Sequence, residues 1–131
     1  MSSPVEIKIN LDALRHNFNQ TRTIAPDSRI MAMVKGNSYG HGMVACAQVL
    51  TNADGFGVAR FNEALALRNA GIQHPILITT GIRNQQALQV SARLGCAITL
   101  HNDSQLTLLR ETSLEKPIHL WLKVNTGLNR L

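Results

Sequence analysis

Short apolar runs alternate with helix-like segments at a nearly constant spacing along this chain, and this alternation constrains the fold more than any other feature. Strands are expected at five places: residues 30–34, 55–59, 75–79, 96–100 and 117–124. The first run, Ile-Met-Ala-Met-Val, is continuously apolar, as expected of a strand buried on both faces. Strands that alternate with helices of about ten residues predict parallel βα units.

Helix signals lie between these strands. Helices are predicted at residues 11–25, 43–50, 61–70 and 84–94, and from Asn102 to about residue 111. Asn10 and Asn102 are expected to cap the helices that follow them, and Gly71 and Gly95 to end the helices that precede them.

The first turn after a buried strand separates two kinds of parallel sheet. A doubly wound sheet usually carries a G-x-G-x-x-G pattern there, whereas residues 36–42 read Gly-Asn-Ser-Tyr-Gly-His-Gly. Equal βα units suit a (β/α)8 barrel instead, but a barrel closes with eight strands and about 250 residues. The 131 residues therefore predict an α/β fold, a partial (β/α)8 TIM-type barrel of about five βα units, truncated before closure.

The N-terminal residues have a different pattern. Val5, Ile7 and Ile9 alternate with Glu6 and Lys8, which is the period of a half-exposed strand. We therefore divide the chain into an N-terminal strand at residues 1–10 and the barrel portion at residues 11–131.

The composition excludes several partners. The net charge is +5, but the 13 Lys and Arg residues are scattered, and aromatic residues make up 4% of the chain, so no nucleic-acid partner is expected. No apolar segment reaches eighteen residues and no signal peptide is present, which predicts a cytoplasmic protein with no membrane partner. Cys46 and Cys96 have no metal-ligand spacing and are expected to fill small apolar sites rather than form a disulfide.

Lys35 directly follows the first buried run, at the sheet edge where sites form in parallel α/β proteins. Desolvation there favours a neutral amine, which can form a Schiff base with an aldehyde. The alternative is that Lys35 only extends into water from the strand end.

The turn after Lys35 favours the chemical interpretation. Gly36, Gly40 and Gly42 leave backbone N–H groups open to close approach, and the helix that follows presents its positive end, a combination that suits an anion. Tyr39 adds a hydroxyl donor in the same turn. His41 is expected to cap backbone groups rather than to catalyse.

Residues 34–42, Val-Lys-Gly-Asn-Ser-Tyr-Gly-His-Gly, resemble the cofactor motif of the alanine racemase family, usually Val-Lys-Ala-Asn-Ala-Tyr-Gly-His-Gly. Residues 122–131, Leu-Lys-Val-Asn-Thr-Gly-Leu-Asn-Arg-Leu, resemble the family's Leu-Lys-Val-Asp-Thr-Gly-Met-x-Arg-Leu-Gly segment. Further similarities lie between them, in order, at residues 54–59, 63–64, 67–68, 75–77, 101–102 and 105–106.

This resemblance implies an isomerase that interconverts L- and D-alanine through a pyridoxal 5'-phosphate Schiff base and supplies D-alanine for cell-wall peptidoglycan. Lys35 would hold the cofactor and act as the base at Cα of the D-enantiomer. Tyr39 would bind the cofactor phosphate, and Arg130 the cofactor's phenolic oxygen and the substrate carboxylate. No metal site is expected.

Lys123 poses an electrostatic problem. If Lys123 points into the barrel near Arg130, two positive charges lie close together in an interior that excludes water, and their repulsion is unfavourable. The resemblance implies that Lys123 is carbamylated and becomes an anion; a carboxylate from elsewhere in the protein is the alternative. Asn125 replaces the family's usual aspartate and removes one anion from this segment.

The resemblance also implies parts that these residues do not supply. The family's second base is a tyrosine from the C-terminal β-domain of the partner subunit in a homodimer, so the chain is expected to be inactive alone, and residues 1–10 to pair with that β-domain. Open sheet edges predict self-association of the chain. A broad-specificity or other amino-acid racemase, a non-catalytic protein that binds pyridoxal phosphate, and a barrel enzyme without this cofactor remain alternatives.

Overall fold

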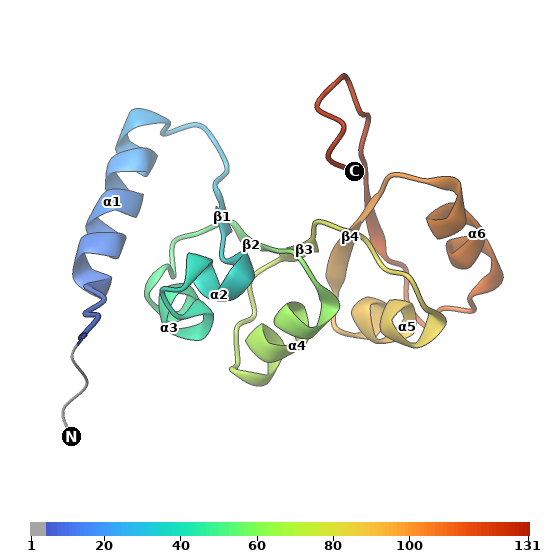
Figure 1. Ribbon diagram of the computed structural model, residues 1–131, viewed down its shortest axis with the longest axis horizontal. Helices are drawn as coiled ribbons and strands as arrows, with labels where there is room; N and C mark the ends of the chain where they lie inside the picture. Colours follow the sequence, from blue (N-terminus) through green and yellow to red (C-terminus); the bar gives the residue numbers. More distant parts are fainter. Residues whose placement is uncertain (1–4) are drawn as a thin grey trace.

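In the part of the chain that the structure describes, five parallel strands form a single sheet whose order follows the chain, β1-β2-β3-β4-β5 (Figure 1). The computed structural model describes residues 5–131. The strands are β1 (Met31–Met33), β2 (Gly55–Val58), β3 (Ile76–Ile78), β4 (Cys96–Leu100) and β5 (His119–Leu122). The predicted α/β fold of parallel strands alternating with helices is confirmed, with five strands and, among the described residues, helices after the first four of them, and the sheet is not closed.

The helices follow the predicted alternation. They are α1 (Leu11–Ile24), α2 (Lys35–Tyr39), α3 (Met43–Val49), α4 (Phe61–Asn69), α5 (Gln85–Arg93) and α6 (Asp103–Glu111). The predicted caps form, because Oδ1 of Asn10 accepts from the Ala13 N–H at 3.0 Å and Oδ1 of Asn102 from the Gln105 N–H at 2.9 Å. The short helix α2 was not predicted.

The core lies between the sheet and the helices on one of its faces. Phe56, Val58 and Ile78 are fully buried on the strands, and Leu67 and Leu88 are buried beneath them on α4 and α5. Burying each such side chain stabilises the fold by about 1.5–3 kcal/mol. This packing fixes the strands whose ends carry the candidate site.

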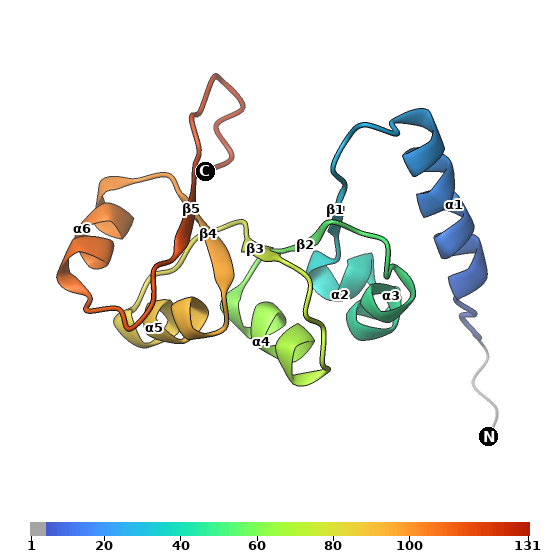
Figure 2. The same cartoon turned by 180° about the vertical axis from the view of Figure 1, so that it is seen from behind.

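The opposite face of the sheet is open. Figures 1 and 2 show α4 and α5 on one side of the strands and the C-terminal segment on the other. All four residues of β5 are exposed, and Met33 in β1 is 40% exposed. The expectation that the first strand is buried on both faces is therefore wrong, because within residues 5–131 no second layer covers this face.

The predicted N-terminal strand does not form in the described residues. Residues 5–10 have no regular secondary structure, and Ile7 is 81% exposed. A strand requires the hydrogen bonds of a neighbouring strand, and the sheet begins only at β1. Residues 1–4 of that prediction lie outside the described part, and the division at residue 10 stays a prediction.

Arg22 and Asp54 join the end of α1 to the sheet. The Arg22 guanidinium donates to the Asp54 carboxylate at 2.7 Å and to the Asn52 carbonyl at 2.9 Å. The same carboxylate accepts from the Ile30 N–H at 2.7 Å. The hydrogen bond from Ile30, followed by that from Arg22, lowers the pKa of Asp54 below its usual 3.8.

Both cysteines are buried and neither forms a disulfide, as predicted. Burial raises the pKa of the Cys96 thiol, so this side chain fills space rather than reacting. Within residues 5–131 no helix is both long enough and apolar enough to cross a bilayer.

Candidate active site

Lys35 stands where the sequence places it, at the carboxyl edge of the parallel sheet. Val34, the residue between β1 and Lys35, is 2% exposed, and its N–H donates to the Gly57 carbonyl of β2 at 2.9 Å. The backbone is therefore anchored in the sheet immediately before the lysine. The Lys35 residue itself is half-buried.

The turn after Lys35 is wound in the left-handed sense. Gly36, Asn37, Ser38 and Tyr39 have φ angles of 60°, 55°, 53° and 54°. Such angles cost a residue other than glycine about 1–3 kcal/mol and persist only where the surroundings enforce them. Glycine at position 36 was a visible signal for a tight turn, whereas nothing in Asn-Ser-Tyr predicted three further residues of this conformation.

Asn37 holds the turn together. Its Oδ1 accepts from the Met43 N–H at 2.9 Å, and its carbonyl accepts from the N–H groups of Gly40 and Gly42 at 3.1 and 3.0 Å. Met43 begins α3, so the first N–H of that helix is bonded within the protein. The expectation that the glycines and the start of this helix leave N–H groups open to an anion is thus wrong, because those of Gly36, Gly40, Gly42 and Met43 all donate within the protein.

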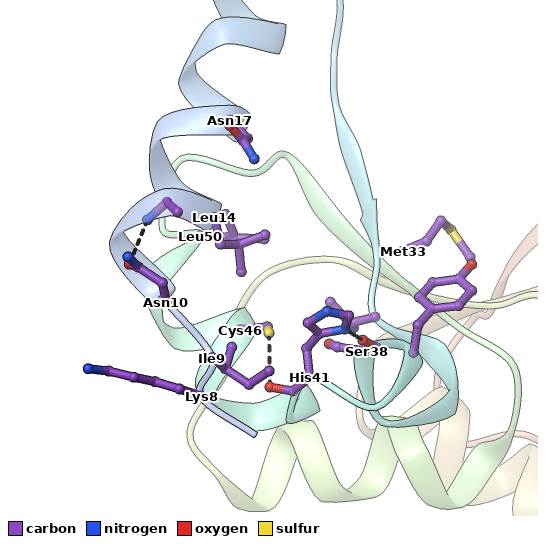
Figure 3. Close-up of a pocket in the computed structure, with 13 residues that line it drawn as sticks. Lys8, Ile9, Asn10, Leu14, Asn17, Met33, Ser38, His41, Cys46 and Leu50 are labelled. Carbon is purple, nitrogen blue, oxygen red and sulfur yellow. Dashed lines mark hydrogen bonds between the residues drawn. The ribbon is translucent and has the colours of Figure 1, made fainter. Parts of the chain in front are cut away.

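His41 also stabilises the turn, through a contact between its ring and the backbone. Its Nδ1 lies 2.8 Å from the Ser38 carbonyl oxygen, which confirms the prediction that His41 caps backbone groups. Figure 3 shows both residues beside a hollow of about 620 Å³ between α1 and the segment from β1 to α3, with Leu14 and Leu50 across it. The Ser38 hydroxyl is buried without a hydrogen-bond partner at this hollow.

Glu63 is a site residue whose role sequence reasoning missed. It lies in the first turn of α4, and its carboxylate accepts from the Ala59 and Arg60 N–H groups at 2.8 and 3.0 Å. It also accepts from the Gly36 N–H, the amide that follows Lys35, at 2.7 Å. A Glu three residues after the residue that caps a helix start is a recognisable capping signal, but the contact with Gly36 joins two βα units and leaves no local pattern.

A second hollow, of about 410 Å³, brings Lys35 and Tyr39 together. The remaining lining residues come mostly from the end of β2 and the start of α4, and they are Gly36, Ala59, Arg60, Asn62 and Glu63. The volume falls in the range of small-molecule sites. Arg60 and Asn62 were not predicted, although both follow a strand at the same edge as Lys35.

The fifth strand places its predicted residues elsewhere. Lys123 is half-buried just after β5, where its N–H donates to the Leu100 carbonyl at 2.9 Å, and Arg130 is exposed. Figures 1 and 2 show the C-terminal segment beside β4 and β5, across the sheet from α2. Neither of the two ion pairs among residues 5–131 includes Lys123 or Arg130.

Asn125 organises the loop before Arg130. Its Oδ1 accepts from the N–H groups of Gly127 and Asn129 at 3.0 and 3.1 Å, and its Nδ2 donates to Oδ1 of Asn129 at 2.8 Å. Asn129 has a φ of 55°. The residue that departs from the family's aspartate is therefore the one that closes this loop.

Residues 9–131 match the family model described as alanine racemase, N-terminal domain. The chain belongs to the alanine racemase family. This match covers every described element, so the five-stranded sheet and the Lys35 turn are those of an alanine racemase N-terminal domain.

Named alanine racemases are similar over nearly the whole chain. It is 46% identical to the alanine racemase of Edwardsiella ictaluri over 123 residues, which is 94% of this chain and 34% of that protein. It is 43% identical to the biosynthetic alanine racemase of Escherichia coli K12 over 95% of this chain and 35% of that protein. The chain therefore spans about a third of the length of these curated relatives.

The solved structures agree in fold. The biosynthetic alanine racemase from Pseudomonas aeruginosa superposes with a TM-score of 0.88 at 30% identity, over 93% of this chain and 34% of that one. The open sheet of five parallel strands thus corresponds to part of a longer alanine racemase chain.

Proposed function

We propose that the protein containing this chain interconverts L- and D-alanine with pyridoxal 5'-phosphate held on Lys35, and that its D-alanine serves cell-wall peptidoglycan. The observation that carries this function is Lys35 at the carboxyl edge of an alanine racemase sheet, in a hollow that it shares with Tyr39. The names of the bacterial relatives support the reaction and the choice of alanine.

The residues of this hollow fit the cofactor chemically. Lys35 lines the hollow and offers a primary amine for the aldehyde. Tyr39 offers a hydroxyl donor, and Arg60 a guanidinium, both suited to a phosphate. When bound, the cofactor supplies the electron sink for the negative charge that develops at the substrate Cα.

Lys35 has two tasks in this function. Its Nζ holds the cofactor covalently at rest, and the same amine, when released, accepts the Cα proton of D-alanine and returns a proton to that face. Racemisation needs a second base on the opposite face, because the two enantiomers present their protons on opposite sides. We assign that base to a tyrosine in the C-terminal β-domain of a partner subunit, as the family resemblance implies.

Arg130 is proposed to bind the substrate carboxylate and the cofactor's phenolic oxygen, for which its planar donor fork is suited. Its loop stands beside the sheet without a described ion pair. We also propose that Lys123 is carbamylated in the active protein and pairs with Arg130. Intact-protein and peptide mass spectrometry under bicarbonate is expected to show the added carbon dioxide on Lys123, and a plain amine there in an active enzyme contradicts this.

The decisive experiment is covalent trapping. The protein that carries this chain is incubated with pyridoxal 5'-phosphate and reduced with borohydride, and its peptides are mapped by mass spectrometry. We expect the phosphopyridoxyl group on Lys35 and its loss in Lys35→Arg, with Lys116→Arg, an exposed lysine, as the matched control. A phosphopyridoxyl label found on other residues and not on Lys35 contradicts the cofactor assignment.

The reaction is tested by chiral analysis of alanine. The intact protein is expected to convert L-alanine to the racemic mixture, and the 131-residue chain by itself to show no conversion, since it supplies one of the two bases. Conversion of serine or lysine in preference to alanine indicates another amino-acid racemase. Cofactor labelling of an intact protein that racemises nothing indicates a non-catalytic carrier.

A further inference from the structure

One carboxylate, that of Glu63, connects the turn after Lys35 to the neighbouring βα unit. It accepts three backbone N–H groups, from Gly36 at 2.7 Å, Ala59 at 2.8 Å and Arg60 at 3.0 Å. The first belongs to the turn after β1, and the other two lie where β2 passes into α4. Hydrogen bonds to an ionised carboxylate are among the stronger ones in proteins.

The bond to Gly36 bears directly on the direction of the Lys35 side chain. The Gly36 N–H belongs to the peptide that joins Lys35 to Gly36, so holding it fixes the backbone rotation at the lysine Cα. Gly36 is also the first of the four residues with positive φ. The other described hydrogen bonds of residues 35–42 stay within residues 34–46, so Glu63 is what ties this strained turn to another unit.

The hydrogen bonds of the Glu63 carboxylate argue against a role as a general acid, a general base or a counter-ion of Lys35. Both carboxylate oxygens already accept backbone donors: Oε1 accepts from Gly36, and Oε2 from Ala59 and Arg60. Within residues 5–131, neither of the two ion pairs includes Glu63 or Lys35. A carboxylate occupied in this way acts on Lys35 through the backbone and not by exchanging protons with the amine.

We propose that Glu63 is a positioning residue, which orients the Lys35 amine toward the cofactor by holding the Gly36 N–H. This role presupposes the proposed function, because it matters only if Lys35 holds the cofactor. The same carboxylate caps α4, so its removal is expected to lower stability as well. The test therefore has to separate orientation of Lys35 from loss of a cap.

Glu63→Gln is the informative variant. A glutamine side chain has one acceptor oxygen, and if that oxygen faces the two N–H groups at α4, its NH₂ group meets the Gly36 N–H donor to donor. Glu63→Asp keeps the charge but is one methylene shorter, so it cannot reach both turns. Asn84→Ala is the matched control, because Asn84 caps α5 through the Ala87 N–H at 2.9 Å and contacts neither Lys35 nor Gly36.

The experiment measures three quantities in the intact protein. They are the apparent affinity for pyridoxal phosphate, the fraction trapped on Lys35 by borohydride and the hydrogen-exchange rate of the Gly36 amide. We expect Glu63→Gln and Glu63→Asp to weaken trapping on Lys35 and to speed Gly36 exchange about tenfold each, the effect of one charge-assisted hydrogen bond. Asn84→Ala is expected to lose similar stability and to leave both readouts within about twofold.

The outcomes separate the two proposals. If the wild-type protein shows no label on Lys35, the proposed function fails, whatever Glu63 does. If the wild type is labelled and both Glu63 variants are trapped as efficiently as Asn84→Ala, the positioning role is wrong and Glu63 is only a helix cap. Faster Gly36 exchange with unchanged trapping also overturns it, because the turn would then be loosened without consequence for Lys35.

Discussion

Single residues in this domain join parts of the chain that are distant in sequence, and Asp54 is the clearest case outside the candidate site. Its carboxylate accepts from Arg22 at the end of α1 and from the Ile30 N–H just before β1. Asp54 itself directly precedes β2. Three elements therefore depend on one ionised side chain.

This contact predicts an acid-sensitive contribution to stability. The folded-state pKa of Asp54 is lowered, so its contribution is complete above the usual carboxyl value of 3.8 and is lost as the pH falls through the lowered value. Near neutral pH the wild-type chain should unfold at a higher urea concentration than Asp54→Asn. This difference in the unfolding midpoint should shrink as the pH falls through the lowered pKa of Asp54. Asp12→Asn, which removes an exposed pair with Arg15, is the control. A gap that is constant across the acid range contradicts this.

Gly81 shows a second kind of dependence, on the absence of a side chain. Its φ is 72°, and a Cβ there would lie 2.5 Å from the Thr99 carbonyl oxygen and closer still to the Gln105 side-chain amide. Gly95 has a similar φ of 64° with open space around it. We expect Gly95→Ala to cost about 1 kcal/mol of unfolding free energy from backbone strain alone, and Gly81→Ala about 1–3 kcal/mol more. Equal losses of unfolding free energy for the two variants in urea titrations would show that the residues around Gly81 move to accommodate the added methyl group.

At the level of elements, the sequence predicts what depends on local pattern and misses what depends on distant contacts. Five strands, five helices and the caps Asn10 and Asn102 follow from periodicity and capping chemistry, and Lys35 and Tyr39 are found together as the motif indicates. The left-handed winding of α2 is not predictable, because it is held by bonds such as that from Gly36 to Glu63 across 27 positions. The alternation of residues 5–9 indicates which side chains share a face but not which strand they pair with, so the pairing of residues 1–10 with a C-terminal β-domain stays a prediction.

The loop from Asn125 to Asn129 provides a test at this scale. Removing the Asn125 amide leaves the N–H groups of Gly127 and Asn129 without the acceptor that closes the loop. Asn125→Ala is therefore expected to speed hydrogen exchange at both amides by about fivefold, on the basis of about 1 kcal/mol per bond. Thr126→Ala, an exposed change in the same loop, should leave their exchange rates unchanged. Unaltered exchange in Asn125→Ala would mean that the loop is held by other contacts.

The molecule as a whole is a curved sheet with helices on one face and an open face opposite. Its β5 strand is exposed along its length and, within residues 5–131, pairs only with β4. Unpaired strand edges of this kind tend to associate with other chains. The 131-residue chain alone is therefore expected to self-associate as its concentration rises.

Introducing a charged side chain at an exposed position tests which surface mediates this self-association. Leu122 in β5 and Leu128 in the following loop are each 75% exposed. Leu122→Lys is expected to shift the sedimentation coefficient toward that of a monomer, because a lysine on an edge strand opposes pairing. Leu128→Lys should behave like the wild type. A wild-type chain that stays monomeric at high concentration contradicts self-association, and equal effects of the two changes place it away from β5.

The order of the sheet also bears on how the chain is made. Each strand pairs with the one before it, for example Ile76 with Phe56 and Cys96 with Ile76, about twenty residues earlier. A strand leaving the ribosome thus meets a partner that has already emerged, and each βα unit can join the growing sheet without waiting for later sequence. We expect partly synthesised chains that end after α4 or α5 to be protected from proteolysis in their completed units, so that the domain assembles in the direction of translation.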